Sequence, residues 1–230
     1  MKSNTKKIIK EQSNKELKIN SKLGNSEDFS FGSRTQESFI SDPKHLLFNL
    51  ARYKFVSKIF SQYKNVLEIG CGDGFGSSLV AQTTGRLTAT DLDILFINES
   101  QKKHPLKNKI IFKQVNLLKN YVDGNFDGAF CLDVLEHIPV SLEDVFITNI
   151  VKSLNPKGDL IVGMPSLESQ KYASKISKQG HVNCKTGLDL KKTMEKYFSK
   201  IFMFSMNDEV LHTGFFPMSH YLLALCIEKK

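Results

Sequence analysis

Three glycines stand at alternate positions in the run VLEIGCGDG, which covers residues 66–74. Glycine has no β-carbon, so such a loop can adopt positive φ angles and expose its backbone N–H groups to a ligand. A loop of this kind at the carboxyl end of a strand is suited to holding a cofactor. The dinucleotide pattern G-x-G-x-x-G would need a further glycine where this chain has Phe75 or Ser77. The loop therefore predicts a cofactor site, and the absent glycine argues against a phosphate cradle.

Polar residues also follow the next three predicted strands. Asp91 ends the second strand, about 20 residues after the first glycine, where a carboxylate can accept hydrogen bonds from both hydroxyls of a ribose. Asn116 and Leu117 follow the third strand, and the run LDVLEHIP over residues 132–139 follows the fourth. An Asn side-chain oxygen can accept a hydrogen bond from an exocyclic amine. Because parallel strands end at one edge of a sheet, these residues are expected beside the glycine loop.

These motifs, in this order, resemble those of the class I S-adenosylmethionine-dependent methyltransferases, and the LEHI run is similar to a segment of the small-molecule branch of that family. The resemblance covers about residues 60–165. It implies that S-adenosyl-L-methionine is the cofactor, bound with micromolar-scale affinity in preference to NAD or ATP. It also implies that the cofactor is contacted by the residues Glu68, Gly70, Cys71, Gly72, Gly74, Asp91, Leu92, Asn116, Leu117 and Asp133.

The same resemblance bears on the methyl acceptor. Family members that methylate base amines commonly carry an acidic residue or Asn before Pro-Pro and an aromatic residue, whereas Asp133 is followed by Val134. Cytosine methylation at carbon 5 needs a nucleophilic cysteine, usually after proline, and the chain has no Pro-Cys pair. A small hydroxylated acceptor, such as a quinone precursor, a sugar or a glycolipid head group, is therefore favoured. Two alternatives stay open: an RNA or protein methyltransferase that uses the basic tail, and a non-catalytic cofactor-binding protein.

A hydroxyl acceptor benefits from a general base, and histidine can accept a proton near neutral pH. Loops that leave the strands face the ligand, and the polar loops of this kind cover residues 133–139, 165–185 and 206–220. Each contributes one candidate catalytic base, in the order of preference His181, His137 and His212.

A metal site is not expected from the sequence. Glu209 and His212 have the i, i+3 spacing of metal ligands, with Asp208 beside them. No further ligand can be assigned, so a turn cap and surface charges explain these residues better. Three other histidines are interpreted as structural or solvent-facing, namely His45, His104 and His220.

Short apolar segments that alternate with amphipathic stretches predict an α/β fold, with a Rossmann-like, mostly parallel sheet and helices on both faces. The resemblance adds an antiparallel last strand. Seven strands are expected, at residues 66–69, 87–91, 110–115, 126–132, 159–164, 201–205 and 221–227. Helices are expected at about residues 75–82, 94–102, 142–154 and 188–197, after a leading helix that begins at Asp42-Pro43. The run NPKG at residues 155–158 is expected to be a turn that ends a helix.

The chain is expected to divide into a Lys-rich flexible tail over residues 1–38 and one domain over residues 39–230. The domain would hold the cofactor half at about residues 60–165 and substrate-side loops at about 165–220. Residues 1–22 hold seven lysines and two glutamates, which is +5 of the net charge of +8. Only three of the 32 basic residues are arginine, the side chain favoured in nucleic-acid recognition, so nucleic acid is not an expected partner. The tail is expected to be dispensable for cofactor binding.

The remaining composition bears on location. The longest apolar run, residues 221–227, is far shorter than the roughly 20 residues that cross a bilayer. The four cysteines lie far apart, without a C-x-x-C pair, which argues against a zinc ribbon or a disulfide scaffold. A cytoplasmic enzyme without a transmembrane segment is therefore expected, and the sequence does not indicate its oligomeric state.

Overall fold

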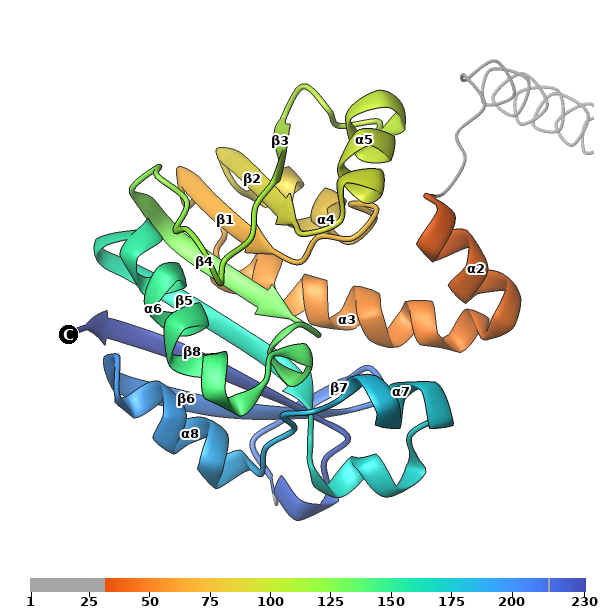
Figure 1. The fold of residues 1–230 in the computed structure, drawn as a ribbon, viewed down its shortest axis with the longest axis vertical. Helices are drawn as coiled ribbons and strands as arrows, with labels where there is room; N and C mark the ends of the chain where they lie inside the picture. The colour runs from red at the N-terminus through yellow and green to blue at the C-terminus, as the bar shows by residue number, and fades with distance from the viewer. Residues whose placement is uncertain (1–31, 215) are drawn as a thin grey trace, which may run out of the picture. The chain divides into compact units, whose positions relative to one another are not determined.

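The computed structural model describes residues 32–214 and 216–230. Within these residues, eight strands form one sheet in the order β3-β2-β1-β4-β5-β8-β6-β7 (Figure 1). The strands are Asn65–Ile69 (β1), Arg86–Asp91 (β2), Ile110–Gln114 (β3), Phe126–Leu132 (β4), Leu154–Pro165 (β5), Phe198–Asn207 (β6), Val210–His212 (β7) and Tyr221–Lys229 (β8). Strands β1 to β5 pair in parallel, whereas β8 is antiparallel to both β5 and β6. The predicted α/β fold class and the antiparallel last strand are confirmed.

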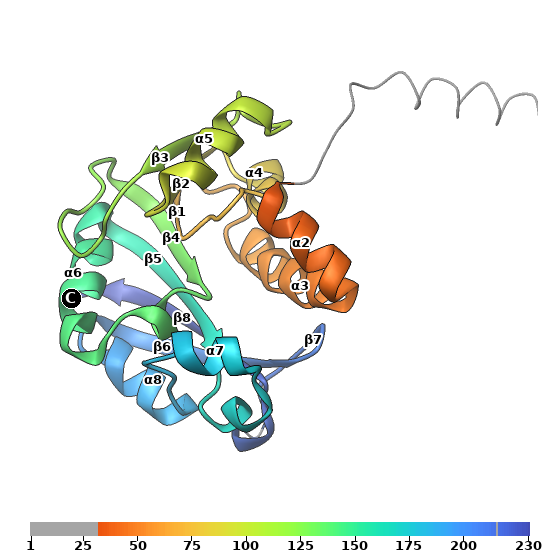
Figure 2. The ribbon, with the colours of Figure 1, turned by 45° about the vertical axis from the view of Figure 1, so that its right-hand side comes forward.

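Helices cover both faces of the sheet (Figure 2). They are α2 (Ser33–Ser41), α3 (Pro43–Ile59), α4 (Ser77–Thr83), α5 (Ile94–Lys103), α6 (Glu143–Ser153), α7 (Lys175–Gly180) and α8 (Gly187–Glu195), with short 3-10 segments at Leu135–His137 (η1), Val140–Leu142 (η2), Glu168–Tyr172 (η3) and Phe216–Met218 (η4). Val56 of α3, Val80 of α4 and Ile97 of α5 are buried in one core. Phe146 of α6 and Leu190 of α8 are buried in a second core on the opposite face. In the described part of the chain, no helix is both long and apolar enough to span a membrane.

The sheet topology fixes where a ligand can bind. Strand β1 lies between β2 and β4, so the direction of the crossover connections reverses between β1 and β4. In open α/β sheets, the crevice outside the carboxyl ends of the strands at such a reversal is the usual binding position. The glycine loop follows β1 at this crevice.

Residues 155–158 differ from the sequence prediction. The NPKG run does not end a helix, because α6 ends at Ser153 and β5 begins at Leu154. Leu154 pairs with Phe126 of β4, and the pairing register shifts before the regular ladder begins at Asp159. A strand interrupted in this way accommodates proline, which has no N–H to donate.

The eighth strand, β7, was not expected. It pairs with β6 across a tight hairpin in which Asp208 has a positive φ of 53°. Its three residues are too few for an alternation pattern to be recognised in the sequence.

The folded domain begins earlier than the predicted boundary at residue 39. Helix α2 already starts at Ser33, and Thr35 in its first turn is buried. The helix is held by hydrogen bonds to Asp73 and Glu99, which are distant in the sequence and leave no mark on local composition. Residues 1–31 of the predicted tail lie outside the described residues.

Candidate active site

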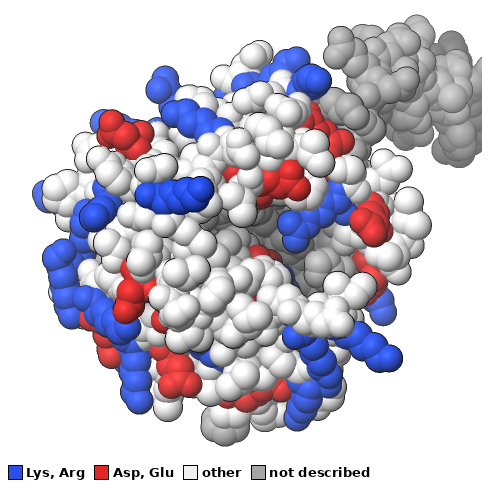
Figure 3. Space-filling view, in the orientation of Figure 1, with Lys and Arg blue, Asp and Glu red and all other residues white. Residues whose placement is uncertain are grey.

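A pocket of about 430 Å³ opens at the carboxyl ends of β1 and β4. It is lined by side chains and backbone from residues 34–38, 45–53, 70–76, 132–137 and 165–181. Near the middle of Figure 3 the surface is hollowed, with both acidic and basic side chains at the rim. The pocket therefore combines the glycine loop with helices α2 and α3 and with the segments that follow β4 and β5.

The glycine loop is held in a fixed shape that requires positive φ angles. Gly70 and Gly72 have φ angles of +80° and +54°. A β-carbon on Gly70 would lie 2.2 Å from Cγ2 of Val134, so only glycine fits there. The N–H of Gly70 donates to the Thr90 carbonyl oxygen (2.7 Å), and the N–H of Gly72 donates to Oδ2 of Asp91 (2.8 Å). Strand β2 thus fixes the loop, and Gly70 and Gly72 line the pocket.

Glu68, the acidic residue of the motif, lies behind the loop and not in the pocket lining. Its side chain is only 1% exposed, and Oε1 accepts a hydrogen bond from the hydroxyl of Tyr53 on α3 (2.9 Å). Burial raises the pKa of Glu68 to about 7, although the nearby Ser77 and the hydrogen bond from Tyr53 act in the opposite direction. Glu68 therefore joins α3 to β1 beneath the site.

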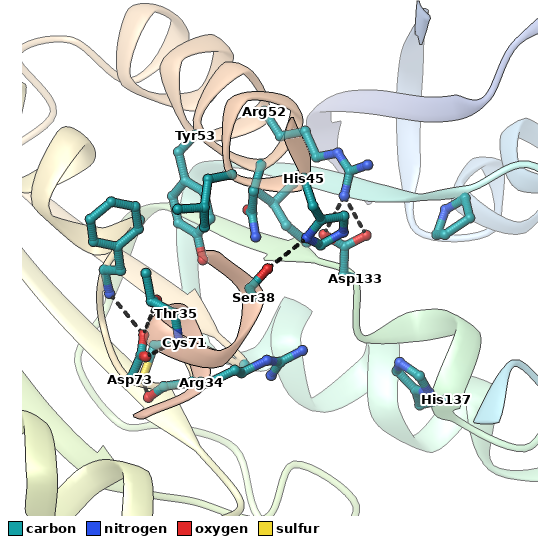
Figure 4. Close-up of a pocket in the computed structure, with 18 of the residues that line it drawn as sticks. Arg34, Thr35, Ser38, His45, Arg52, Tyr53, Cys71, Asp73, Asp133 and His137 are labelled. Atoms are coloured by element: carbon teal, nitrogen blue, oxygen red, sulfur yellow. Dashed lines mark hydrogen bonds and ion pairs between the residues drawn. The ribbon is translucent and has the colours of Figure 1, made fainter. Parts of the chain in front are cut away.

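Helix α2 is attached to the glycine loop through Asp73. Thr35 donates two hydrogen bonds to this carboxylate, from its N–H to Oδ2 (2.7 Å) and from its hydroxyl to Oδ1 (2.9 Å). Ser33 donates from its hydroxyl to Oε2 of Glu99 on α5 (2.8 Å). Arg34, between these anchors, extends into the pocket, as Figure 4 shows. The helix therefore places a guanidinium beside the glycine loop.

An ion pair connects α3 with the end of β4. Nη1 of Arg52 donates to both carboxylate oxygens of Asp133, at 3.0 and 2.8 Å. The guanidinium also lies over the ring of Tyr221, with its carbon 3.8 Å from the ring centre. Asp133 itself has a φ of 56°, a conformation that is strained for a residue with a β-carbon. The pair therefore fixes one wall of the pocket and neutralises the Arg52 charge.

Two histidines meet at the side of the pocket away from α2. The rings of His137 and His181 have centroids 5.1 Å apart. Nδ1 of His137 contacts the Gly180 carbonyl oxygen (2.9 Å), and Nδ1 of His181 contacts Oε1 of Gln170 (2.8 Å). Burial lowers the pKa of His181, and the neighbouring His137 lowers it further, with Asp133 acting in the opposite direction. Both effects favour the neutral form of the His181 imidazole.

Glu136 completes this group. Its side chain is 1% exposed, and burial together with the nearby Asp133 raises its pKa to about 8. We call Glu136, His137 and His181 the Glu-His-His cluster. All three residues line the pocket.

His212, the third candidate base, is not brought to the pocket. It lies on β7, where Nδ1 contacts the Ser205 hydroxyl (3.1 Å) and Nε2 contacts Oδ1 of Asn207 (3.2 Å). These contacts stabilise the β6–β7 hairpin. Of the three predicted bases, only His137 and His181 share the site.

The remaining predicted cofactor residues lie in different places relative to the pocket. Cys71 lines the pocket, whereas Asp91 and Leu92 lie along the edge of the sheet beside it. Asn116 follows β3 at the same edge, and its Oδ1 accepts a hydrogen bond from the Leu118 N–H (2.9 Å). Leu117 is 5% exposed and belongs to the core, so its side chain is not placed with the others. Gly74 lies behind the loop, where Phe112 and His104 leave no room for a β-carbon.

S-adenosylmethionine fits this set of groups. The Asp91 carboxylate can accept from ribose hydroxyls, and the Leu92 side chain beside it is 63% exposed, so it offers apolar surface to a base. Beside Gly72, the nearest atoms to a β-carbon position belong to Arg34 at 3.5 Å, so the guanidinium lies against the loop. The Arg34 guanidinium suits a carboxylate partner. These residues could hold the ribose, the base and the amino-acid part of the cofactor.

Several lining residues were not placed at the site from the sequence. Arg34 was assigned to the tail and was a candidate partner for the cofactor's carboxylate only if the tail acts as a lid, and Arg52 has no partner within its own helix that would mark it. His45 was interpreted as structural or solvent-facing, yet it lines the pocket, with Nδ1 3.2 Å from the Ser38 hydroxyl. The sequence signal for this region was the Asp42-Pro43 start of α3. It predicts where the helix begins but not which face of the helix meets the site.

Comparisons with known proteins agree with this geometry. Residues 67–162 match a family described as "Methyltransferase domain". A ubiquinone biosynthesis O-methyltransferase of Haemophilus ducreyi is 31% identical over 132 residues, 52% of this chain and 53% of the relative. The mitochondrial ubiquinone biosynthesis O-methyltransferase of Schizosaccharomyces pombe is 28% identical over 126 residues, 50% of this chain and 45% of the relative. The chain thus spans about half the length of these curated relatives.

Solved structures show the same fold. The methyltransferase domain of bacterial CtHen1 has a TM-score of 0.64 at 18% identity, covering 78% of this chain and 98% of that one. The N-methyltransferase NodS from Bradyrhizobium japonicum, in complex with S-adenosyl-L-homocysteine, has a TM-score of 0.58 at 20% identity, covering 83% and 87%. These solved methyltransferases therefore share the α/β fold of this chain. With the motifs and the family match, residues 67–162 carry the methyltransferase domain of the class I S-adenosylmethionine-dependent family.

Proposed function

We propose that the protein transfers a methyl group from S-adenosylmethionine to a hydroxyl group of a small acceptor, a phenolic quinone precursor. The names of the curated relatives support this choice of acceptor. The observation that carries the proposal is the arrangement of the pocket. The glycine loop, with the Asp91 carboxylate beside it, lies on one side of the pocket and suits the cofactor. The Glu-His-His cluster, which is suited to removing a proton, lies on the other side.

Figure 4 shows the two sides together. Cys71 and Asp73 lie on one side of the pocket and His137 on the other, with Arg34 extending between them. His181 packs against His137 in the same wall. One cavity can therefore hold a methyl donor and an acceptor next to each other, and such positioning supplies most of the rate in a displacement reaction.

The cofactor side would be held by residues of three elements. Asp91 would bind the ribose, the N–H groups of the glycine loop would line the amino-acid part, and Arg34 would bind its carboxylate. When bound, S-adenosylmethionine supplies a methyl group on a positively charged sulfur, already activated for transfer. Helix α2, through Thr35 and Asp73, would keep water away from the loop.

The acceptor side would be the Glu-His-His cluster. A phenolic hydroxyl must lose its proton as the methyl group arrives, and a group within hydrogen-bond reach assists this step. Because Nδ1 of each histidine is engaged by the protein, Nε2 is the nitrogen that remains for the acceptor. The proton would therefore be lost at this cluster, with His181 ahead of His137 in importance.

Two measurements test the proposal. Calorimetry should show binding of S-adenosylmethionine with micromolar-scale affinity and no comparable binding of NAD or ATP. With a phenolic quinone precursor as acceptor, His181→Ala should lower turnover by about 10²–10⁴-fold and leave cofactor affinity unchanged.

His212→Ala is the matched control, because this histidine lies outside the pocket lining and should leave turnover near the wild-type value. If His181→Ala and His137→Ala both retain full turnover, the acceptor is an amine or a thiol, or orientation alone drives the reaction. Absence of cofactor binding would contradict the proposal as a whole.

A further inference from the structure

The side chain of His181 is oriented by one neighbour, Gln170. Nδ1 of the imidazole lies 2.8 Å from Oε1 of this glutamine. The ring of His137 packs against His181, but a ring contact does not determine which nitrogen carries the proton. Gln170 lies outside the pocket lining, so any role in the reaction acts through His181.

The contacts of the Gln170 amide determine which end of it faces the histidine. Its Nε2 lies 3.3 Å from the Ser166 carbonyl oxygen, which can only accept a hydrogen bond. Nε2 also lies 3.5 Å from Oγ of Ser169, and that hydroxyl already donates its proton to the Ser166 carbonyl oxygen (2.8 Å). Both partners therefore accept from the amide nitrogen, which leaves the amide oxygen facing His181.

The turn that carries Gln170 is built on a buried serine. Ser166 is fully buried, and its hydroxyl donates to the Ser219 carbonyl oxygen (2.5 Å) while accepting from the Ser169 N–H (3.0 Å). The N–H of Ser166 donates to the His220 carbonyl oxygen (3.0 Å). The segment before β8 therefore holds the start of η3, and protein contacts alone fix the position of Gln170.

The backbone of His181 is fixed independently of Gln170. Its N–H donates to the Ser177 carbonyl oxygen (2.8 Å), and the next two N–H groups along the chain both donate to the Glu136 carbonyl oxygen, at 2.8 and 3.0 Å. The backbone thus sets where the ring lies on the acceptor wall. Rotation of the ring and the choice of the protonated nitrogen are left to Gln170.

We propose that Gln170 is a positioning residue for methyl transfer, which holds His181 in the tautomer with the proton on Nδ1 and the lone pair on Nε2. The amide oxygen only accepts, so Nδ1 must donate to it. A neutral imidazole has one N–H, so Nε2 is free to take a proton from the pocket. Bases of this kind are commonly oriented by a third group.

The consequence for catalysis rests on the proposed function. The O–H bond of the acceptor would break, with its proton passing to the Nε2 lone pair of His181. The electron pair left on the oxygen would form the new bond to the methyl carbon, and the pair of the sulfur–carbon bond would return to sulfur. With the opposite tautomer, Nε2 would carry a proton already and the step would be blocked.

A neutral amide suits a base that must be unprotonated before the reaction. The titratable groups around the His181 ring are His137, Glu136 and Asp133. Burial lowers the pKa of His181 and His137 lowers it further, whereas Asp133 acts in the opposite direction. A carboxylate in place of the Gln170 amide would add a second negative charge and raise this pKa. Glutamine therefore fixes the tautomer without favouring the protonated ring.

The tautomer is measured without cofactor or acceptor. Long-range ¹H–¹⁵N correlation spectra of the full chain with ¹⁵N-labelled histidine distinguish a protonated ring nitrogen from one with a lone pair. For neutral His181 we expect a protonated Nδ1 and an unprotonated Nε2, with the signals assigned by their loss in His181→Asn. In Gln170→Leu these signals should move toward a mixture of tautomers. Those of His137, whose Nδ1 contacts the Gly180 carbonyl oxygen (2.9 Å), should not move.

Turnover separates a positioning role from a structural one. With a phenolic acceptor, Gln170→Leu should lower kcat by about 10-fold or more, but by less than the 10²–10⁴-fold expected for His181→Ala. KM for the acceptor and the affinity for the cofactor should not change, because Gln170 does not line the pocket. Gln179→Leu, at an exposed position of α7 in the same segment, is the matched control and should keep the wild-type kcat.

Gln170→Glu gives a second, opposite readout. The carboxylate still accepts from Nδ1 of His181, so the tautomer should be retained. Because the carboxylate raises the pKa of His181, the pH at which kcat reaches half its maximum should move upward. A residue that only supports the fold would not move this midpoint.

Three results would overturn the inference. One is a wild-type spectrum with the His181 proton on Nε2, and another is an unchanged tautomer and kcat in Gln170→Leu. The third is a loss of kcat in Gln170→Leu that is matched by the loss of cofactor affinity, with no shift of the midpoint in Gln170→Glu. Failure of the proposed function is distinguishable, because the spectra require neither cofactor nor acceptor. If the tautomer is fixed by Gln170 and no methyl transfer occurs, the proposed function fails and the hydrogen-bond assignment stands.

Discussion

The two walls of the pocket are built in different ways. Most of the cofactor wall comes from one stretch of chain, residues 65–91, in which β1, the glycine loop, α4 and β2 follow each other directly, and α2 adds Arg34 and Thr35. The acceptor wall joins residues 136–137 to Gln170 and to residues 180–181, which meet only through long-range contacts. The first wall depends on three glycines with positive φ angles, and each wall includes one buried carboxyl group, Glu68 in the first and Glu136 in the second. A single substitution in the glycine loop should therefore affect the first wall most. A change in the protonation of Glu68 or Glu136 should affect the wall to which that residue belongs.

The largest expected effect is at the glycine loop. Gly70→Ala places a β-carbon at φ +80° and 2.2 Å from Val134, so strain and overlap add. We expect a loss of about 2–5 kcal/mol in the free energy of unfolding, measured by denaturant titration. Gly72→Ala, which has the strained φ without the overlap, should lose only about 1–2 kcal/mol. Equal losses in the two variants would show that Val134 is not the cause.

The next effect is the pH dependence of stability that Glu68 causes. The folded carboxyl holds its proton up to a pKa of about 7, while the unfolded one releases it near 4.5. Between these two pKa values the folded state binds more protons than the unfolded state. The free energy of unfolding therefore falls as pH rises, by about 3 kcal/mol in total. Glu68→Gln should remove this part of the profile and be more stable than the wild-type chain at pH 8. If the stability of the wild-type chain and of Glu68→Gln changes with pH in the same way, Glu68 is not the cause of the pH dependence.

Asp91 should have a smaller and more specific effect. Asp91→Ala should weaken S-adenosylmethionine binding by about 1.5–3 kcal/mol in calorimetry, because charge-assisted hydrogen bonds to the ribose and to Gly72 are lost. Asp93→Ala is the control, since Asp93 caps α5 by accepting from the Leu95 N–H and should change stability but not cofactor affinity. Undiminished binding in Asp91→Ala would place the ribose elsewhere.

The smallest effect concerns the attachment of α2. Thr35→Val keeps the side-chain shape and removes the hydroxyl that donates to Asp73. We expect cofactor affinity to fall by about 0.5–1.5 kcal/mol. Thr186→Val, which removes the cap of α8 and lies outside the pocket lining, should leave this affinity unchanged. If Thr35→Val binds the cofactor as the wild-type chain does, the Thr35 hydroxyl is not needed to hold α2 beside the cofactor.

Most of the fold and the cofactor wall could be predicted because their signals are local. Glycines at 70, 72 and 74 and the carboxylate at 91 belong to one strand–loop–helix–strand unit, so spacing alone places them. The acceptor wall could not be assembled in this way. His137 and His181 were both candidates, and they meet because Val182 and Asn183 dock on the Glu136 carbonyl oxygen. His212 lies on β7, outside the pocket lining. Arg52 pairs with a residue 81 positions later, and no pattern along α3 reveals such a partner.

The position of β8 has a consequence for how the chain folds. Strand β6 is made before β8, yet it reaches the rest of the sheet only through β8, which is inserted between β5 and β6. Until β8 arrives, β5 has an unpaired edge, and the β6–β7 hairpin has no sheet to join. Pairing between strands so distant in sequence is slow, and an open edge invites association with other chains. The interval before β8 docks is therefore when this protein is most exposed to aggregation, and it should depend most on chaperones then.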